Sequence, residues 1–169
     1  MHSENFNRKA QDYVNLLHLQ PHPEGGFYKE TYRAEMQAGF DSFGGVRNVS
    51  TGIYYLLDHG NFSAFHRIKS DEMWHFYDGT GLTVYVIHPQ GDLEIIRLGK
   101  NLAGGETLQA VVPAGCWFAS TVEQQEGFAL VGCTVAPGFD FQDFELAKRA
   151  SLIGLFPAHK ELIHRLTRK

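Results

Sequence analysis

Short runs of β-branched and aromatic residues, separated by turns rich in glycine, proline and aspartate, recur through most of the chain. Segments of this composition favour extended backbone, because branched and aromatic side chains pack well on a pleated surface. About nine strands are predicted, at 27–33, 49–57, 62–68, 72–76, 82–88, 93–98, 107–112, 116–122 and 128–136. Short strands at such regular spacing are typical of an all-β sandwich or barrel.

Helical patterns flank the strands at both ends of the chain. Residues 3–19 are predicted to form a helix with Ser3 as its N-cap and with Ala10 and Tyr13 on one apolar face. After residue 137 the period becomes helical again, with one helix from about 144 to 155 and a second opened by Pro157. The segment 34–48 has three glycines and no clear period, so we expect a loop there.

The length of 169 residues suits one domain, since single cores usually occupy ~100–200 residues. We expect a single domain over 1–169, with the barrel core at about 26–137 and a helical C-terminal segment at about 143–169. Such barrels leave exposed sheet edges that pairing would cover, so a homodimer is expected.

Composition indicates which classes of partner and which cellular compartment to expect. The net charge of -4 provides no basic excess to attract a nucleic-acid backbone. No stretch approaches the ~20 apolar residues of a membrane span, and the N-terminal residues lack an apolar signal region. We therefore expect a cytoplasmic protein without nucleic-acid or membrane partners, whose Cys116 and Cys133 are unoxidised.

His66 and Glu72 are the first candidate catalytic residues. Alternation in 62–79, FSAFHRIKSDEMWHFYDG, predicts two strands joined by a charged turn, which would fold His66 back opposite Glu72. Neutral histidine is a base near physiological pH, and a facing carboxylate would orient its ring. The alternative is a barrel-interior pair that only satisfies its own hydrogen bonds.

The strand expected at 27–33 supplies the next candidates. Tyr28, Glu30 and Tyr32 share one face of it. If that face is the inner one, they provide a phenol acid, either Tyr28 or Tyr32, and a second carboxylate. If it is the outer face, they are surface or subunit-contact residues. The candidates for substrate binding are Glu30, Trp74, Phe76, Tyr85 and Phe118.

The spacing of His66, Glu72 and Gly79 resembles the first cupin motif, and Pro113 and Gly115 resemble the start of the second. Both motifs also depart from the pattern. Ala64 and Phe118 stand where cupins place two histidines, so two of the four usual metal ligands are replaced by apolar residues.

Because two of the usual ligand positions are apolar here, no cofactor is expected. A divalent metal, if present, would be held by His66, Glu72 and His75. On a strand, however, the offset of three between Glu72 and His75 places their side chains on opposite faces.

Four stretches resemble one group of cupins over most of the chain: LQPHPEGGFYKETYR, SDEMWHFYDG, VVPAGCWFAS and CTVAPGFDFQDFELA. They are similar to the cupin-5 group, whose function is unknown. The resemblance implies a cupin barrel, a double-stranded β-helix or jelly roll, with one N-terminal helix and C-terminal helices. The cupin-5 group is also similar in architecture to dTDP-4-dehydrorhamnose 3,5-epimerase-type cupins. In those enzymes a histidine supported by a carboxylate removes a proton beside a ketone, and a tyrosine returns one.

These observations lead to a functional prediction with two alternatives. The first is a metal-independent isomerase or epimerase acting on a small carbonyl compound, such as a sugar derivative. In it His66 is the base, Glu72 orients His66, and Tyr28 or Tyr32 is the acid. The alternatives are a non-catalytic protein that binds a sugar or nucleotide in the same barrel pocket, and a metal-dependent cupin enzyme.

Overall fold

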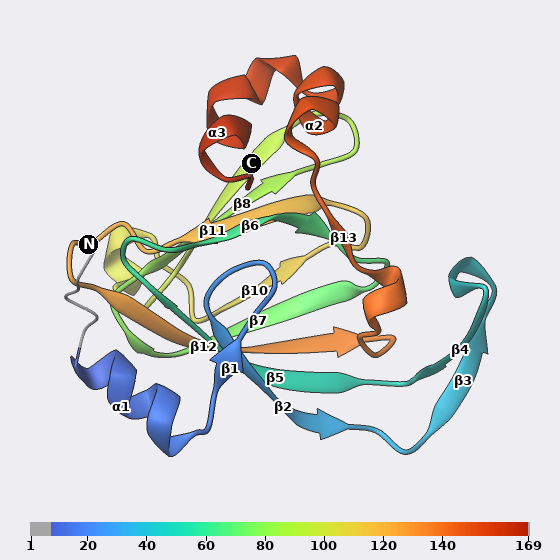
Figure 1. Cartoon of the computed structure of the whole chain (residues 1–169), viewed down its shortest axis with the longest axis horizontal. Coiled ribbons are helices and arrows are strands. Elements are labelled where there is room, and N and C mark those ends of the chain that lie inside the picture. The colour runs from blue at the N-terminus through green and yellow to red at the C-terminus, as the bar shows by residue number, and fades with distance from the viewer. Residues whose placement is uncertain (1–7, 169) are drawn as a thin grey trace.

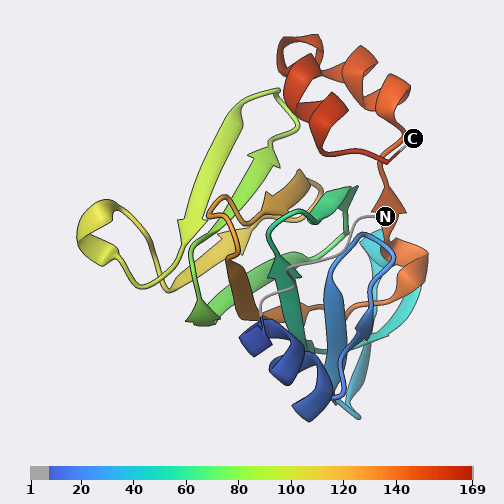
Figure 2. The same ribbon diagram turned by 60° about the vertical axis from the view of Figure 1, so that its left-hand side comes forward.

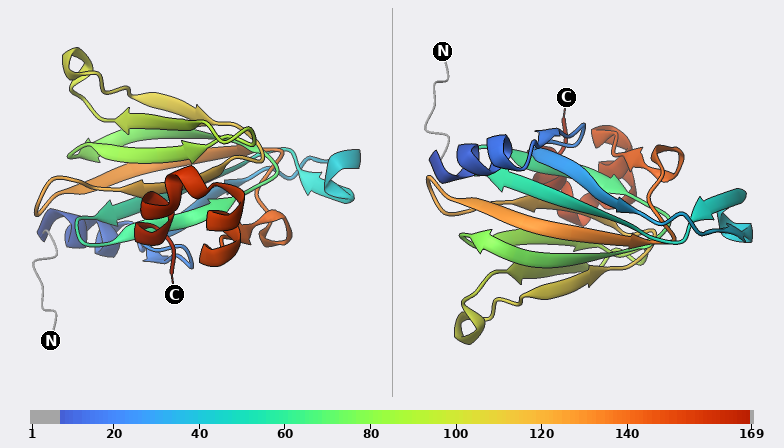
Figure 3. Two further views of the ribbon diagram at one scale, coloured as in Figure 1. Left: turned by 90° about the horizontal axis from the view of Figure 1, so that it is seen from above. Right: turned by 90° about the horizontal axis from the view of Figure 1, so that it is seen from below.

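Two antiparallel β-sheets lie face to face in the computed structural model, which describes residues 8–168 (Figure 1). Ser3, the predicted N-cap, lies outside these residues. The layered arrangement is clearest from above and below (Figure 3). The two sheets confirm the predicted all-β architecture.

The larger sheet has six strands in the order β1-β2-β5-β12-β7-β10. Their bounds are β1 (Gln20–Pro21), β2 (Phe27–Arg33), β5 (Thr51–Asp58), β12 (Phe128–Ala136), β7 (Asp71–Gly79) and β10 (Gln109–Val112). The smaller sheet has five strands in the order β13-β6-β11-β8-β9. Their bounds are β13 (Glu145–Leu146), β6 (Phe62–Arg67), β11 (Trp117–Thr121), β8 (Leu82–Ile87) and β9 (Leu93–Leu98).

Strand β7 shows how the sequence creates the core. Glu72, Trp74 and Phe76 are buried, whereas Asp71, Met73 and Tyr77 between and beside them are largely exposed. This alternation places one face of the sheet against the barrel interior. The interior is filled by side chains from both sheets, including Tyr55, Leu57, Trp74, Val84, Phe118 and Val131.

Helices cover the outer faces of both sheets. Helix α1 (Arg8–Leu16) packs Ala10 against Leu56 of β5 and against Phe128 and Leu130 of β12. At the other end of the molecule, α2 (Arg149–Leu155) and α3 (Lys160–Arg165) cover the smaller sheet (Figure 2). No helix in 8–168 has the length and apolar character needed to cross a membrane.

The segment expected to be a loop at 34–48 is instead a β-hairpin. Strands β3 (Gln37–Phe40) and β4 (Gly45–Asn48) pair antiparallel and project from the barrel (Figure 1). They are joined by a short 3-10 turn, η1 (Asp41–Phe43), and Gly44 follows it in the left-handed conformation that glycine adopts readily. The helix expected from about 144 begins only at Arg149, because Glu145 and Leu146 pair with β6.

Candidate functional site

A cavity of about 470 Å³ opens between the two sheets. Its lining includes Arg33 and Thr51, which flank the β3–β4 hairpin in the chain, so it lies at the end of the barrel that carries this hairpin. Its floor is polar and its rim is aromatic. The lining residues include His22, Glu24, Tyr28, Glu30, Arg33, Ile53, His66, Glu72, Cys133, Phe139, Asp140, Phe141 and Phe144.

His66 and Glu72 both line this cavity, but they do not belong to one hairpin. Strand β6 carries His66 and pairs with β11 and β13 in the smaller sheet. Strand β7 carries Glu72 and pairs with β10 and β12 in the larger sheet. The charged turn between the strands therefore crosses from one sheet to the other, and the two side chains approach the cavity from different sheets.

The carboxylate bonded to His66 is Glu24, not Glu72 as predicted. His66 Nε2 lies 2.8 Å from Glu24 Oε2, and both side chains are buried. His66 Nδ1 lies 2.7 Å from the carbonyl oxygen of Ala64. A carbonyl oxygen only accepts hydrogen bonds, so Nδ1 carries a proton.

The ion pair of His66 and Glu24 determines the charge of the His66 ring. Burial lowers the pKa of His66, but the charge of Glu24 and its hydrogen bond outweigh burial and hold that pKa above its ordinary value. Burial raises the pKa of Glu24, but the charge and hydrogen bond of His66 outweigh it and hold the pKa below its ordinary value. Glu24, with its lowered pKa, is a carboxylate at neutral pH and can only accept, so its 2.8 Å contact places a proton on His66 Nε2. Since Nδ1 also carries a proton, the pair is an imidazolium and a carboxylate, with both ring N–H groups donating.

Glu24 reaches the barrel floor because of the glycine pair that follows it. Gly25 has a φ of 115°, and a Cβ there would overlap the carbonyl oxygen of Phe62 in β6. The loop is fixed in this close approach because Ala64 N donates to Glu24 O at 2.8 Å and Tyr55 Oη donates to Gly25 O at 2.7 Å. A side chain at position 25 would push the loop, and Glu24 with it, away from His66.

His22 completes the floor as a neutral ring. The backbone N–H of Glu24 donates to His22 Nδ1 at 3.2 Å, so the proton of the neutral ring is on Nε2. Burial lowers the pKa of His22, and the charge of Glu24 offsets only part of that effect. The ring contacts Tyr28 edge-on, with their centroids 4.6 Å apart.

Glu72 is the group on the cavity wall that titrates near neutrality. Burial, together with the negative charge of Glu24, raises its pKa from 4.5 to about 7, although the charge of His66 acts in the opposite direction. The Cys133 thiol donates a hydrogen bond to Glu72. Burial and the charge of Glu72 raise the pKa of Cys133 well above its ordinary value, so it stays a neutral thiol.

The raised pKa of Glu72 predicts a pH-dependent stability. Because its folded pKa lies above its unfolded value of 4.5, the folded state loses stability as pH rises from 4.5 to about 7, by up to ~3 kcal/mol. Glu72→Gln should remove this loss, so the variant should gain stability relative to the natural protein between pH 5 and pH 8. Urea unfolding at both pH values measures the gain, and a stability difference that does not change with pH would contradict it.

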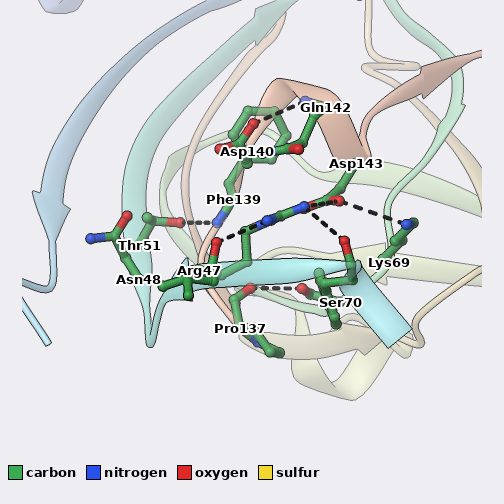
Figure 4. A network of polar contacts seen from close by, with 12 residues as sticks. Arg47, Asn48, Thr51, Lys69, Ser70, Pro137, Phe139, Asp140, Gln142 and Asp143 are labelled. Atoms are coloured by element: carbon green, nitrogen blue, oxygen red, sulfur yellow. Dashed lines mark hydrogen bonds and ion pairs between the residues drawn. The ribbon is translucent and has the colours of Figure 1, made fainter. Parts of the chain in front are cut away.

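A segment after β12 forms the rim of the cavity. It includes η3 (Phe141–Asp143) and contributes Phe139, Asp140, Phe141 and Phe144 to the lining. Figure 4 shows how it is held. Arg47 of β4 donates two hydrogen bonds to Asp143, at 2.7 and 2.8 Å, and Thr51 Oγ1 accepts one from Phe139 N at 2.9 Å. The β3–β4 hairpin thus fixes one side of the cavity mouth.

Strand β2 presents Tyr28 and Glu30 to the cavity, but not Tyr32. The pairing of β2 with β5 shifts register between Glu30 and Tyr32, which is the mark of a β-bulge. After the bulge Arg33 lines the cavity, and Tyr32 is 57% exposed. The prediction that placed Tyr28, Glu30 and Tyr32 on one face is therefore wrong for Tyr32.

The other predicted contact residues do not line the cavity. Trp74, Phe76 and Phe118 are buried in the main core, although the Phe118 ring packs against His66 with their centroids 4.0 Å apart. Tyr85 packs with the cluster under the C-terminal helices and donates a hydrogen bond to Glu123. These side chains support the walls rather than offering contacts to a ligand.

His75 lies on the other face of β7 from Glu72, as its offset predicts. Its ring is bonded to Thr134 and Gln109, 3.0 and 3.1 Å away, outside the cavity. Within 8–168 no group of three or more His, Cys, Asp or Glu side chains is placed to hold a metal ion. Because both nitrogens of His66 are also engaged, the predicted trio of His66, Glu72 and His75 does not fit a metal ion.

Sequence reasoning missed Glu24 and Cys133 as cavity residues. Glu24 lies on an irregular loop, so no periodicity places it. Its signal was the glycine pair directly after it, which marks a close approach of the backbone. Alternation in β12 would indicate Cys133 only if one face of that strand were polar. Almost every residue of β12 is buried, so the sequence does not distinguish the face that lines the cavity from the opposite face.

Comparison with known proteins gives this chain clear relatives. Residues 11–147 match the model of a family described as Cupin superfamily (DUF985). An uncharacterized protein of Saccharomyces cerevisiae, YML079W, is 33% identical over 151 residues, which cover 82% of this chain and 75% of the yeast protein.

Solved structures agree with this match. The crystal structure of protein SO0799 from Shewanella oneidensis is 46% identical with a TM-score of 0.86, covering 94% of this chain and 97% of that one. A hypothetical protein from Leishmania major is 34% identical with a TM-score of 0.90, covering 95% and 99%. Oxalate decarboxylase from Bacillus subtilis, at 16% identity and a TM-score of 0.57 over 88% of this chain and 37% of the enzyme, shares the fold alone.

Proposed function

The chain belongs to the DUF985 family of the cupin superfamily, and from this premise we propose that it is an isomerase or epimerase that needs no metal. Its substrate is a small carbonyl compound, such as a sugar derivative, bound in the barrel cavity. The yeast and Leishmania relatives are named only as uncharacterized or hypothetical, so support for the proposal comes from the cavity itself. The observation that carries it is a buried carboxyl group, Glu72, that titrates near neutral pH and faces the same cavity as a fixed imidazolium, His66.

Glu72 is the base in this proposal, in place of His66. Its carboxylate removes a proton from the carbon next to the carbonyl group, and the electrons of the broken C–H bond pass to the carbonyl oxygen, which becomes an enolate. A carboxyl group with a pKa of about 7 is well suited to this step, because it is partly ionised at neutral pH and binds the proton once it is removed. His66 cannot serve as the base, since both of its nitrogens already carry protons.

The Glu24–His66 pair and Tyr28 supply the remaining roles. Proton transfer moves one negative charge from Glu72 to the enolate, so the net charge of the cavity does not change. The imidazolium of His66, fixed in the same cavity, attracts that charge more strongly than it would in water. Glu24 is a positioning residue that keeps the ring charged and oriented. The Tyr28 phenol lines the same cavity and is the acid that returns a proton to carbon as the enolate reverts to the carbonyl. The Tyr28 phenolate then regains a proton from water, and protonated Glu72 gives its proton to water.

Proton exchange with solvent tests this proposal directly. The protein is incubated in D₂O with a panel of neutral aldoses, ketoses and their amino and deoxy derivatives, and deuterium at the carbon beside the carbonyl is followed by NMR. We expect enzyme-dependent exchange into at least one compound. Exchange that is absent for every compound that binds the protein would contradict the proposal.

One observation favours a second candidate, a non-catalytic binding protein. The charges of Glu24 and His66 pair with each other, so no ligand is needed to neutralise a buried charge on the cavity floor. A ligand that raises the Tm in a saturable way and never exchanges deuterium would indicate binding without turnover.

A further inference from the structure

We infer that the cavity takes an uncharged or amine-bearing carbonyl compound and rejects phosphate and carboxylate groups, and that Glu30 enforces this choice by holding Arg33. The inference deepens the proposed function by naming a ligand class, and it depends on that proposal only in taking the cavity as the binding site.

The first observation is the balance of charge around the cavity. Four carboxyl groups line it, from Glu24, Glu30, Glu72 and Asp140. Its cationic side chains, among the described lining residues, are Arg33 and the imidazolium of His66. An anionic ligand would enter a region with an excess of negative charge, which is unfavourable in a partly buried site.

The second observation is that both cations are already engaged. His66 donates to Glu24 and to the carbonyl oxygen of Ala64, so neither N–H is free. Arg33 donates Nε to Glu30 Oε1 at 2.9 Å and Nη2 to Glu30 Oε2 at 2.8 Å, a bidentate pair. It also donates Nη1 to Asn48 at 2.9 Å and Nη2 to the carbonyl oxygen of Phe139 at 3.0 Å.

This engagement leaves little for a phosphate or carboxylate to bind. A guanidinium has five N–H groups, and four of those on Arg33 are used within the protein. An anion would have to displace the Glu30 carboxylate to gain the bidentate geometry that guanidinium recognition of anions uses. Glu30 therefore acts as an internal substitute for the anion.

The third observation is the aromatic rim. Phe141 lies edge-on to Phe139 and to Phe144, with ring centroids 4.9 and 5.9 Å apart. Ring faces at such a rim suit the C–H surface of a sugar or the positive charge of an amine. The Asp140 carboxylate, on the same segment, favours the amine further.

The experiment compares anion binding by the natural protein and Glu30→Ala. Inorganic phosphate and pyruvate are titrated by calorimetry at constant ionic strength, with sodium chloride as the balance. We expect no saturable binding of either anion by the natural protein. Glu30→Ala should bind them saturably, with a Kd at least ~10-fold below the highest anion concentration at which the natural protein shows no binding. The reason is that Arg33 stays held by Asn48 and Phe139 while its bidentate face becomes free.

Two further variants make the result specific. Glu145→Ala releases Arg67 from an ion pair of 2.7 Å outside the cavity, so it removes the same charge and should gain no anion binding. Glu30→Ala combined with Arg33→Gln should lose the gain. Glu30 and Arg33 are partly exposed, so these changes should leave the fold intact.

Three results would overturn the inference: saturable anion binding by the natural protein, no gain in Glu30→Ala, or a gain that survives the loss of Arg33. None of these readouts needs turnover. Failure of the deuterium exchange test would therefore leave the inference standing, and failure here would leave proton transfer on neutral compounds untouched.

Discussion

Replacing Glu72 by glutamine should lower the rate of deuterium exchange by ~10²–10⁴-fold, the usual contribution of a general base. Glutamine keeps the shape of the side chain but cannot accept the proton. It also removes a buried ionisable group, so the variant should be folded and at least as stable as the natural protein above pH 7. Deuterium exchange is measured by NMR at the same pH, temperature and substrate concentration for the natural protein and the variant, and the Tm of both proteins is recorded.

A surface variant provides the matched control for this result. Glu145→Gln makes the same chemical change in a half-exposed ion pair outside the cavity, and its exchange rate should equal that of the natural protein. If Glu72→Gln also retains the full rate, Glu72 is not the base.

Glu24→Gln should have the largest effect on stability. It leaves the His66 ring buried without its counter-ion, and breaking a buried pair in this way typically costs ~3–5 kcal/mol. The effect should depend on pH. The stabilisation from Glu24, whose folded pKa is lowered, is lost as pH falls through that folded pKa. The stabilisation from His66, whose folded pKa is raised, is lost as pH rises through it.

The loss of unfolding free energy in Glu24→Gln should therefore be greatest between pH 4.5 and pH 6.5, which are the ordinary pKa values of Glu24 and His66. Urea unfolding at pH 5.5 and at pH 9 measures it. If Glu24→Gln does not fold, Glu24→Gln combined with His66→Gln should fold, because it leaves no unpaired charge in the barrel. Glu145→Gln, in an exposed pair, should cost at most ~1 kcal/mol. A similarly small loss for Glu24→Gln would contradict an ionised pair.

The fold could be predicted from sequence because local patterns carry most of it. Alternation in β7 and the short, regularly spaced runs of branched residues define strands whose inner faces must be buried. The hairpin β3–β4 was missed because its pattern is glycine-rich and partly exposed, so neither periodicity nor burial marks it. It is fixed instead by a tertiary contact, the buried pair of Arg47 and Asp143.

The site was only partly predictable for a related reason. Alternation showed that His66 and Glu72 face inward, and both do line the cavity. It could not show that their strands belong to different sheets, nor that Glu24 enters from an irregular loop to bond His66. The bulge that turns Tyr32 outward is likewise a feature of the pairing of β2 with β5, not of the β2 sequence.

The most direct test of the proposed chemistry is the pKa of Glu72 in the natural protein. It can be measured by NMR from the titration of the ¹³C-labelled carboxyl group, with Glu72→Gln used to assign the signal. A midpoint of about 7 is the predicted result, and it would place a proton-accepting carboxyl group in the cavity beside a charged His66. A midpoint near 4.5 would show that Glu72 is an ordinary carboxylate and would contradict its role as the base.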